Sequence, residues 1–427
     1  MQLSVVDGVL HAIMVGVAES YLGALAVELG HDDRALALLT TVPLLSGALA
    51  QLGAGALATH VGGTRRFVVA GATLQALCLS TFIGIAWFEV KSLLWLLLAK
   101  VAFWCAGSVI APAWGSWMGR LTEHIRRERY FAWRSSIVQL VLLGSFTSAG
   151  ALLARHTEGD LRAFAALHLV GLSARLLSAL ALSQKADIRE ERAVEGQGAT
   201  AARTEGSSLA AAIREANWRV PLYMAMLMLF AHVSVPFYTP YMLRELKLDY
   251  LSFAALTSVS ILAKALVFPL LHPLAARFGL RTVLASGGLG ISFVATSWAY
   301  VTSVPGLAAV QALSGASWGA LEFASFQLLL HSAKADIRLP FLSLASCLQG
   351  VAQLSGALLG SVCLDLDGVD YRGVFLVSGI GRALALLALV RLDDVHRVRS
   401  LFELIARIDS VRPGGGAMRR LWPRSRS

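Results

Sequence analysis

The sequence predicts an all-α membrane protein whose twelve transmembrane helices form two pseudo-symmetric six-helix bundles. Of its 427 residues, 56% are hydrophobic and only 15% are charged, whereas a soluble domain has about 25% charged residues. The charges gather in short gaps between apolar runs of about 20 residues, the length that crosses a bilayer core. A basic turn at residues 55–66 also recurs, in related form, at residues 272–281. Low charge, membrane-length runs and a repeated turn together predict the fold.

Each apolar run predicts one span. The twelve spans fall at 4–28, 35–59, 67–88, 92–119, 135–154, 162–183, 220–242, 250–274, 282–302, 306–330, 340–364 and 373–391. The polar stretch between spans six and seven divides them six and six. The expected domains are an N-terminal bundle, a cytoplasmic linker, a C-terminal bundle and a basic tail, at 1–183, 184–219, 220–392 and 393–427.

The polar segments outside the spans carry two further expectations. Residues 207–218 are predicted to form a short surface helix that leads into span seven. Residues 395–408 place apolar side chains at helical spacing with arginines between them, which is typical of an amphipathic helix on the inner leaflet.

The charges are distributed unevenly between the two sides of this arrangement. Gaps on one side hold 26 Lys/Arg against 13 Asp/Glu, and gaps on the other side hold 7 against 11. The positive-inside rule therefore places both termini in the cytoplasm. The net charge of +10 is what this orientation needs and does not indicate nucleic-acid binding.

No motif for a cofactor, metal or enzyme reaction is recognisable. The four cysteines lie in or beside apolar runs without CxxC or Cys/His spacing, so neither a disulfide framework nor a metal site is expected. The motifs GxxxxGK[ST], HExxH and GxSxG are missing. We therefore expect no cofactor, no metal and no enzymatic activity.

The repeated turn carries the functional signal. Gly62 coincides with Gly279 when the two stretches are aligned, and His60 coincides with Arg277. An apolar chain with the same basic turn at equivalent points of two halves indicates an internally duplicated membrane transporter.

Both turns resemble the loop motif of the major facilitator superfamily, roughly Gly-x-x-x-Asp-Arg-x-Gly-Arg-Arg between spans two and three. In this family the motif recurs, usually weaker, between spans eight and nine. The resemblance implies that an acidic residue locks the closed gate, but Thr59 and Ala276 occupy that position here. The residues that we expect in the gating loops are Gly55, Thr59, Gly62, Arg65, Arg66, Arg277, Gly279 and Arg281.

Three further stretches, 112–117, 126–134 and 236–241, resemble poorly characterised bacterial members of the same family. That resemblance implies a location in the bacterial inner membrane. Residues 142–151 lack the proline that marks drug/proton antiporters in span five. This difference weighs against a drug exporter of that type.

The resemblance also implies a cavity lined mainly by spans one, four, seven and ten. Glu19 lies inside span one, and His11 lies eight residues earlier, near the same helical face. A desolvated carboxylate there suits a proton carrier, although a structural role in helix packing stays open. Asp7, near the inner mouth, is interpreted as a helix-start residue.

In the second half, Glu322 of span ten is the counterpart of Glu19. Lys264 of span eight either binds an anionic substrate or neutralises Glu322. The full set of side chains that we expect along the substrate and proton pathway is Glu19, His11, Tyr21, Trp104, His232, Lys264, Trp318 and Glu322, with Lys100 as a weaker candidate.

Three other features have structural interpretations. Trp114 and Trp117 near the end of span four fit the interfacial aromatic belt. Gly356-x-x-x-Gly360 in span eleven indicates close helix packing.

The expected function is secondary active transport of a small solute by alternating access, with coupling to protons as an option. The alternative is a non-transporting membrane sensor or scaffold with the same fold, which the degenerate loop motifs favour. The expected partners are the solute and the lipid bilayer, without nucleic acid, and we expect a monomer.

Overall fold

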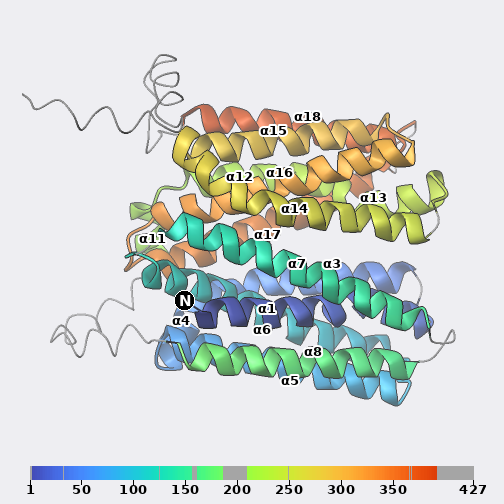
Figure 1. Cartoon of the computed structure of the whole chain (residues 1–427), viewed down its shortest axis with the longest axis horizontal. Coiled ribbons are helices and arrows are strands. Elements are labelled where there is room, and N and C mark those ends of the chain that lie inside the picture. The colour runs from blue at the N-terminus through green and yellow to red at the C-terminus, as the bar shows by residue number, and fades with distance from the viewer. Residues whose placement is uncertain are drawn as a thin grey trace, which may run out of the picture.

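The computed structural model describes residues 2–31, 33–124, 126–155, 161–185, 209–248, 250–364, 366 and 368–391, which contain helices and no strand. The helices run nearly parallel or antiparallel along one long axis (Figure 1). The predicted linker and tail fall mostly on 186–208 and 392–427, outside the described residues. The expected helix at 395–408 therefore also lies outside the described residues.

The N-terminal bundle contains the first six spans. Its helices, in chain order, are α1 (Gln2–Val17) with α2 (Leu22–Glu28), α3 (Asp33–Ala50) with α4 (Ala54–His60), α5 (Thr64–Trp87), α6 (Leu93–Leu121), α7 (Arg127–Leu153) and α8 (Leu161–Ser183). A core of buried Leu, Phe and Ala side chains, among them Leu79, Phe82 and Phe103, holds these helices together.

The C-terminal bundle repeats this order. Its helices are α12 (Arg219–Ser234) with α13 (Tyr238–Pro240), α14 (Tyr250–Phe278), α15 (Leu280–Trp298), α16 (Val304–His331), α17 (Arg338–Leu364) and α18 (Tyr371–Ala385). The short helix α11 (Leu209–Glu215) precedes α12, within the segment where a surface helix is expected.

The first helix of each bundle is interrupted in its second half. Between α1 and α2 the chain tightens into a 3₁₀ turn, Glu19–Tyr21, and between α12 and α13 into another, Val235–Phe237. Pro236 and Pro240 explain the second interruption, because proline lacks the amide hydrogen of a regular helix. Each bundle therefore begins with a discontinuous span.

Two glycines let α12 and α17 approach closely. A Cβ added at Gly356 would lie 2.0 Å from the Leu229 carbonyl oxygen, and one at Gly360 would lie 2.1 Å from the Val233 carbonyl oxygen. The interpretation of this Gly-x-x-x-Gly motif as a packing element is confirmed.

The outer surface is apolar, as a bilayer requires. Large side chains such as Leu266 and Phe293 are more than 60% exposed. Within the described part of the chain, ten helical segments are long and apolar enough to cross a membrane. The two spans outside these ten, α15 and α16, still measure 19 and 28 residues, and frequent Gly and Ser lower their hydropathy.

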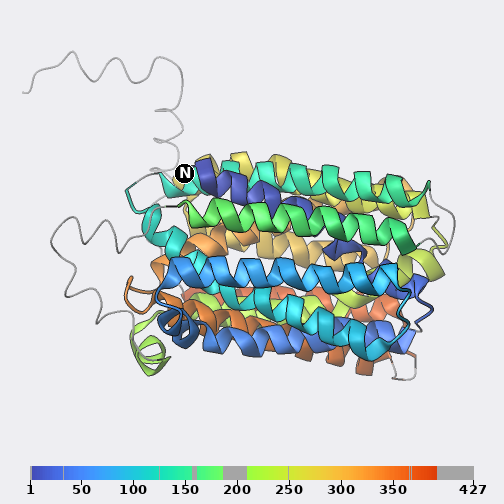
Figure 2. The same cartoon turned by 90° about the horizontal axis from the view of Figure 1, so that it is seen from below.

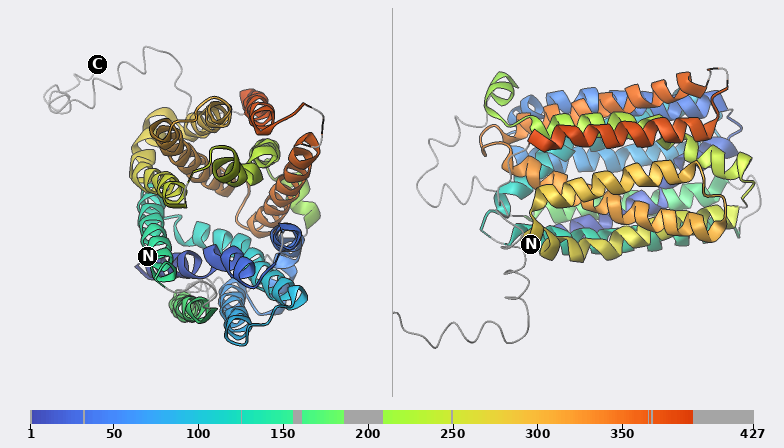
Figure 3. Two further views of the ribbon diagram at one scale, coloured as in Figure 1. Left: turned by 90° about the vertical axis from the view of Figure 1, so that its right-hand side faces the viewer. Right: turned by 90° about the horizontal axis from the view of Figure 1, so that it is seen from above.

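The ends of the helices define two faces. We call the face where α1 begins and α18 leads to the chain end the terminal face, and the opposite one the distal face (Figure 2). Seen along the helices from the distal side, the two bundles lie next to each other as separate groups (Figure 3). One predicted boundary was wrong: α7 begins at Arg127 and not near residue 135. Its first two turns carry Arg127, Arg129 and Arg134, which precede the predicted span, and Arg134 is held there by contacts with Ser4 and Asp7.

Candidate functional site

Aromatic rings join the two bundles near the terminal face. Phe326 of α16 packs against Phe131 of α7, with ring centroids 5.0 Å apart, and against Trp114 of α6 at 6.5 Å. The expectation that Trp114 belongs to a lipid-facing belt was therefore wrong. It was also wrong for Trp117, which is 2% exposed. Helix α6 continues four residues and more beyond both tryptophans, so they lie deeper than their place in the sequence suggests.

Polar contacts also join the two bundles at the terminal face. We call these aromatic and polar contacts together the closure. Arg338 Nη1 donates to Glu123 Oε1 at 3.1 Å, and Arg120 Nη2 donates to the carbonyl oxygen of Ala335 at 3.3 Å. Both contacts join the end of α6 to the start of α17. The terminal face is therefore closed by contacts that must break if the bundles separate there.

A second contact region lies between α7 and α14. Ser136 Oγ donates to the Ala265 carbonyl oxygen at 2.8 Å. Closer to the terminal face, His272 Nδ1 lies 3.7 Å from Glu128 Oε2. These two side chains line a cavity of about 520 Å³ between the bundles, together with Ala276 of α14, His331 of α16 and, around the α6–α7 connection, Thr122, Glu123, Arg126 and Arg127.

The structure brings Lys264 of α14 and Glu322 of α16 together as an ion pair with a hydrogen bond from Nζ to Oε1. Two glycines make this contact possible. A Cβ at Gly315 would lie 2.0 Å from the Ser260 carbonyl oxygen, and one at Gly319 would lie 3.4 Å from Lys264 Cγ. Since α14 and α16 approach closely there, the Lys264 side chain reaches the carboxylate.

The ion pair faces the other bundle. Glu322 lies four residues from both Phe326 and Trp318, so the three side chains share one face of α16. Because Phe326 packs on the N-terminal bundle, Glu322 points to the same side, one turn nearer the distal face. Its side chain is 47% exposed, and that of Lys264 is 19% exposed. The pair therefore borders the space between the bundles, next to the closure.

The region of Glu19 is separate from this pair. Glu19 begins the 3₁₀ turn of the first span, and Lys100 is the charged group that acts on it most strongly. Tyr21 Oη donates to the Phe146 carbonyl oxygen at 2.7 Å, which ties the turn to α7. Among the described residues, no hydrogen bond or ion pair joins Glu19 to Glu322.

The other predicted pathway residues lie away from the Lys264–Glu322 pair, each in its own surroundings. Trp104 is half-buried beside α3, where a Cβ at Gly47 would lie 2.7 Å from its ring. The Nδ1 atom of His232 lies 3.0 Å from the Met228 carbonyl oxygen of its own helix. His11 lines a cavity inside the N-terminal bundle with Asp7.

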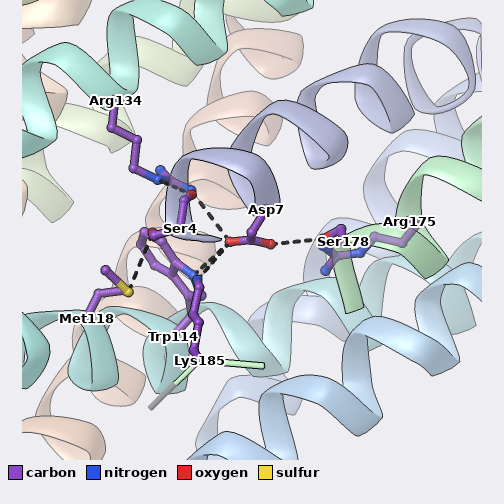
Figure 4. Close-up of polar contacts among 8 residues, drawn as sticks. All are labelled: Ser4, Asp7, Trp114, Met118, Arg134, Arg175, Ser178 and Lys185. Atoms are coloured by element: carbon purple, nitrogen blue, oxygen red, sulfur yellow. Dashed lines mark hydrogen bonds and ion pairs between the residues drawn. The ribbon is translucent and has the colours of Figure 1, made fainter. Parts of the chain in front are cut away.

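A largely buried polar network surrounds Asp7 (Figure 4). Ser178 Oγ donates to Asp7 Oδ1 at 2.8 Å, Trp114 Nε1 donates to Oδ2 at 3.3 Å, and Lys185 Nζ donates to Oδ2 at 3.4 Å. Arg134 Nη2 lies 3.7 Å from the same oxygen. Asp7 is 4% exposed, so its interpretation as a helix-start residue was wrong. It connects α1 to α6, α7 and the end of α8.

Two arginines extend this network. Arg175 Nε donates to Gln75 Oε1 at 2.8 Å, and its Nη1 donates to Ser178 Oγ at 3.0 Å. Arg134 Nε donates to the Ser4 carbonyl oxygen at 2.9 Å. Burial lowers the pKa of the Lys185 ammonium, which lies just beyond the end of α8, and the nearby Asp7 opposes this shift.

Comparisons with known proteins decide the fold family. The sequence model of the Major Facilitator Superfamily matches residues 221–407. A structure of the proton:xylose symporter XylE, bound to 6-bromo-6-deoxy-D-glucose, covers 95% of this chain and 98% of its own, with a TM-score of 0.69 at 13% identity. The chain has the major facilitator fold. The predicted resemblance is confirmed.

Two other solved structures agree. An outward-facing bacterial homologue of the iron transporter ferroportin covers 91% of the chain and 98% of its own, with a TM-score of 0.72 at 16% identity. The major facilitator transporter FucP, in the outward conformation, gives the same coverages with a TM-score of 0.62 at 14% identity. No curated protein matches the sequence.

The two major facilitator loops have matching geometry. The sharp turns use glycines with positive φ, +89° at Gly62 and +87° at Gly279, a conformation that costs other residues energy. Arg65 Nη1 donates to the Lys185 carbonyl oxygen at 3.2 Å, and Arg281 Nη2 donates to the Leu389 carbonyl oxygen at 2.6 Å. Each loop is thus tied to the last span of its own bundle.

The remaining loop residues lie in local surroundings. Thr59 Oγ1 donates to the Ala56 carbonyl oxygen at 2.7 Å, so it does not replace the missing acidic residue. The Arg66 guanidinium lies beside Gly62, a Cβ at Gly55 would meet nothing within 4 Å, and Arg277 stacks on Phe278 at 5.0 Å. A gating role for these residues stays a prediction.

Sequence reasoning missed the Asp7 network. Arg175 lies within the predicted span 162–183 and Lys185 within the predicted linker 184–219, and neither was among the expected site residues. One signal could have found the network: charges inside apolar spans need partners, and Asp7 and Arg175 are two such charges of opposite sign.

Proposed function

We propose that this chain is a secondary active transporter that binds a small solute carrying an anionic group between its two bundles. The observation that carries the proposal is the Lys264–Glu322 ion pair. Charged side chains at the centre of a membrane helix cost about 2.5–3.5 kcal/mol each on insertion scales, and Lys264 lies at the middle of α14. Such a pair at the border of the inter-bundle space favours a role in binding.

The fold supports transport as the general function. The similar structures include a proton:xylose symporter and a bacterial homologue of an iron transporter. Their solutes differ, so the fold does not choose between them, and the chemistry must come from this chain's own side chains.

In the proposed mechanism, Lys264 and Glu322 exchange partners. An anionic group of the solute, or a proton on the Glu322 carboxylate, competes for the pair and releases the Lys264 ammonium to the solute. Contacts such as Arg338–Glu123 hold the terminal face closed. When these contacts break, the terminal face opens, and the two bundles close together at the distal face. This rocking of the two halves gives alternating access to the solute site. Glu19 is a second proposed proton carrier.

The test begins with a ligand screen by thermal stability of the purified protein at several pH values, because a ligand that binds the folded state raises its stability. We expect one class of anionic metabolites to stabilise the wild type. Lys264→Gln and Glu322→Gln abolish this stabilisation, as well as uptake of the same solute into proteoliposomes. Glu215→Gln is the matched control, since it removes an exposed carboxylate at the end of α11, outside both the closure and the pair.

Retention of affinity and uptake in both pair variants would remove the pair from the mechanism. A pH-driven uptake that survives Glu322→Gln but fails in Glu19→Gln would move the proton pathway to Glu19. Proton uptake measured alongside solute uptake separates these outcomes.

A sensor or scaffold is the second candidate, and the loss of the acidic loop residue at Thr59 and Ala276 favours it. Under this alternative, variants of Glu19 and Glu322 keep the protein's cellular output, and no metabolite changes its stability.

We further propose that the protein is a monomer in the bacterial inner membrane with both termini in the cytoplasm, divided into domains at 1–183, 184–219, 220–392 and 393–427. The excess of Lys/Arg in the gaps of the terminal face supports this orientation. Reporter fusions at each terminus test it, because periplasmic activity at either end contradicts the proposal.

A further inference from the structure

A cavity of about 250 Å³ lies inside the N-terminal bundle, apart from the inter-bundle space. Its walls come from α1, α5, α6, α7 and α8. The polar lining residues are Asp7, His11, Gln75, Trp114, Arg134 and Arg175, and Val68, Ile110 and Leu182 belong to the apolar part of the wall. Four of these lining residues, Asp7, Trp114, Arg134 and Arg175, also belong to the polar network drawn in Figure 4.

The charges around this cavity do not balance. Arg134, Arg175 and Lys185 are buried or nearly so, with side chains 13% exposed for Arg134 and 5% for Lys185 and 4% for Arg175 as a residue. Within the described part of the chain, Asp7 is the carboxylate that contacts this group. Three cations therefore surround one anion.

The nearest other carboxylate does not restore the balance. Glu19, twelve residues after Asp7 in the first span, also acts on Arg175, but Lys100 acts on Glu19 more strongly. Glu19 and Lys100 together therefore add no net negative charge to the cluster. A buried charge without a partner is strongly unfavourable. The excess of positive charge around the cavity therefore favours an anionic occupant.

Donor atoms are also available at the cavity. Arg175 uses Nε for Gln75 and Nη1 for Ser178, and no hydrogen bond of its Nη2 occurs within the described residues. The buried His11 Nδ1 has no partner there either. Arg134 stacks on the Trp114 ring, with Cζ 4.7 Å from the centroid, which fixes the guanidinium at the cavity wall.

We propose that this cavity is a second binding site, for an oxyanion such as a phosphate or carboxylate group, held chiefly by Arg175 and Arg134. Arginine guanidinium groups bind such anions through paired, charge-assisted hydrogen bonds. The anion comes either from a free solute or from the headgroup of an anionic lipid. The site lies within one bundle, so it does not depend on the solute site proposed between the bundles.

The test measures the apparent melting temperature of the full chain against inorganic phosphate, and separately against acetate, at an ionic strength held constant with chloride. We expect a saturable rise, because binding to the folded state stabilises it. The same measurement in nanodiscs of phosphatidylglycerol and of phosphatidylcholine tests the lipid source. Stabilisation by free phosphate or acetate identifies a solute site, and stabilisation by phosphatidylglycerol alone identifies a headgroup site.

Two variants must change the affinity in opposite directions. Arg175→Gln weakens phosphate binding about ten-fold or more, as expected when a charge-assisted contact is lost. Asp7→Asn removes the competing negative charge and tightens binding about three- to ten-fold. A merely structural network lowers stability in both variants without this opposite change in affinity. Arg134→Gln replaces Arg175→Gln if the latter does not fold.

Two control variants test whether anion binding is specific to this cavity. Arg281→Gln removes one positive charge from the terminal end of the other bundle, and Lys264→Gln removes the cation of the inter-bundle pair. Both keep the phosphate affinity of the wild type. The proposal is overturned if no anion stabilises the protein, if Asp7→Asn fails to tighten binding, or if Lys264→Gln abolishes it.

Discussion

The two bundles each bury an arginine in their last span, but they satisfy it differently. In the C-terminal bundle, Arg382 is 1% exposed. It donates to the carbonyl oxygens of Ile291 at 2.8 Å and Ala231 at 3.1 Å, and to Ser234 Oγ at 2.7 Å. All three acceptors are uncharged and belong to α12 and α15. The guanidinium there cross-links three helices.

In the N-terminal bundle, Arg175 also links its helix to the first and third spans of the bundle. Its partners, however, lead through Ser178 to the Asp7 carboxylate. Lys185 and Arg134 contact the same carboxylate, and a cavity adjoins them. The last spans of the two bundles thus take part in a neutral cross-link in one half and in an unbalanced ionic cluster in the other.

The difference separates fixed packing from sensitivity to charge. Neutral acceptors on helix backbones stay satisfied whatever the arginine does, because helical hydrogen bonds already use them. A carboxylate among three cations lowers the free-energy cost of burying each of the three positive charges. The N-terminal bundle should therefore respond to the loss of a single charge, and the C-terminal bundle should respond mainly to changes of shape.

The largest effect is expected for Asp7→Asn. It leaves three buried cations without their carboxylate, and breaking a buried pair in this way costs about 3–5 kcal/mol. The apparent melting temperature of the purified protein measures the loss. The double variant with Lys185→Met should regain part of it, and strictly additive losses would show that the two side chains are not coupled.

Gly356→Ala should have the next largest effect, in the C-terminal bundle. The new Cβ would lie 2.0 Å from the Leu229 backbone oxygen, and overpacking of this kind costs about 1–3 kcal/mol. Gly144→Ala in α7 is the matched control, since a Cβ there meets nothing within 4 Å. Equal melting temperatures for the two variants would contradict the close approach of α12 and α17.

Arg382→Met should cost less than Asp7→Asn, about 1–2 kcal/mol, because the burial cost of the charge disappears with its hydrogen bonds. The Ala231 carbonyl oxygen keeps its bond from the Val235 amide. Chemical denaturation of both variants under the same conditions ranks them. A larger loss for Arg382→Met would reverse the contrast between the bundles.

Glu123→Gln should have the smallest effect on stability, below about 1 kcal/mol, because the Glu123 side chain is 40% exposed and exposed ion pairs contribute little. Its effect on conformation should be larger than its effect on folding. Distances between spin labels on the ends of α6 and α17 should broaden in this variant, and an unchanged distribution would show that the pair does not hold the closure.

Much of the fold was predictable, because hydropathy and charge sidedness are properties of single segments. The turn glycines Gly62 and Gly279 were found for the same reason, since their requirement is local. The Lys264–Glu322 contact could be foreseen because few charges lie inside the second half's spans, which limits the choice of partners.

The Asp7 network could not be assembled in this way. Its members come from five spans, α1, α5, α6, α7 and α8, and from Lys185 just after α8. Each of them has a purely structural interpretation when taken alone. Trp114 was assigned to the interfacial belt because tryptophans near span ends usually face lipid. Its contacts with Asp7 and Phe326 depend on the rotation of α6 about its axis, which sequence periodicity in an almost wholly apolar helix does not fix.

The bond from Arg65 to the Lys185 carbonyl oxygen has a consequence for biosynthesis. Lys185 lies two residues after α8, the last helix of the first half, so every residue that fastens this half together has been translated before α12 begins. Domains fold largely as units, the N-terminal one first, while the chain is still being made. The first half can therefore reach its final packing in the bilayer while the second half is still on the ribosome, and it can serve as the surface on which the second half assembles.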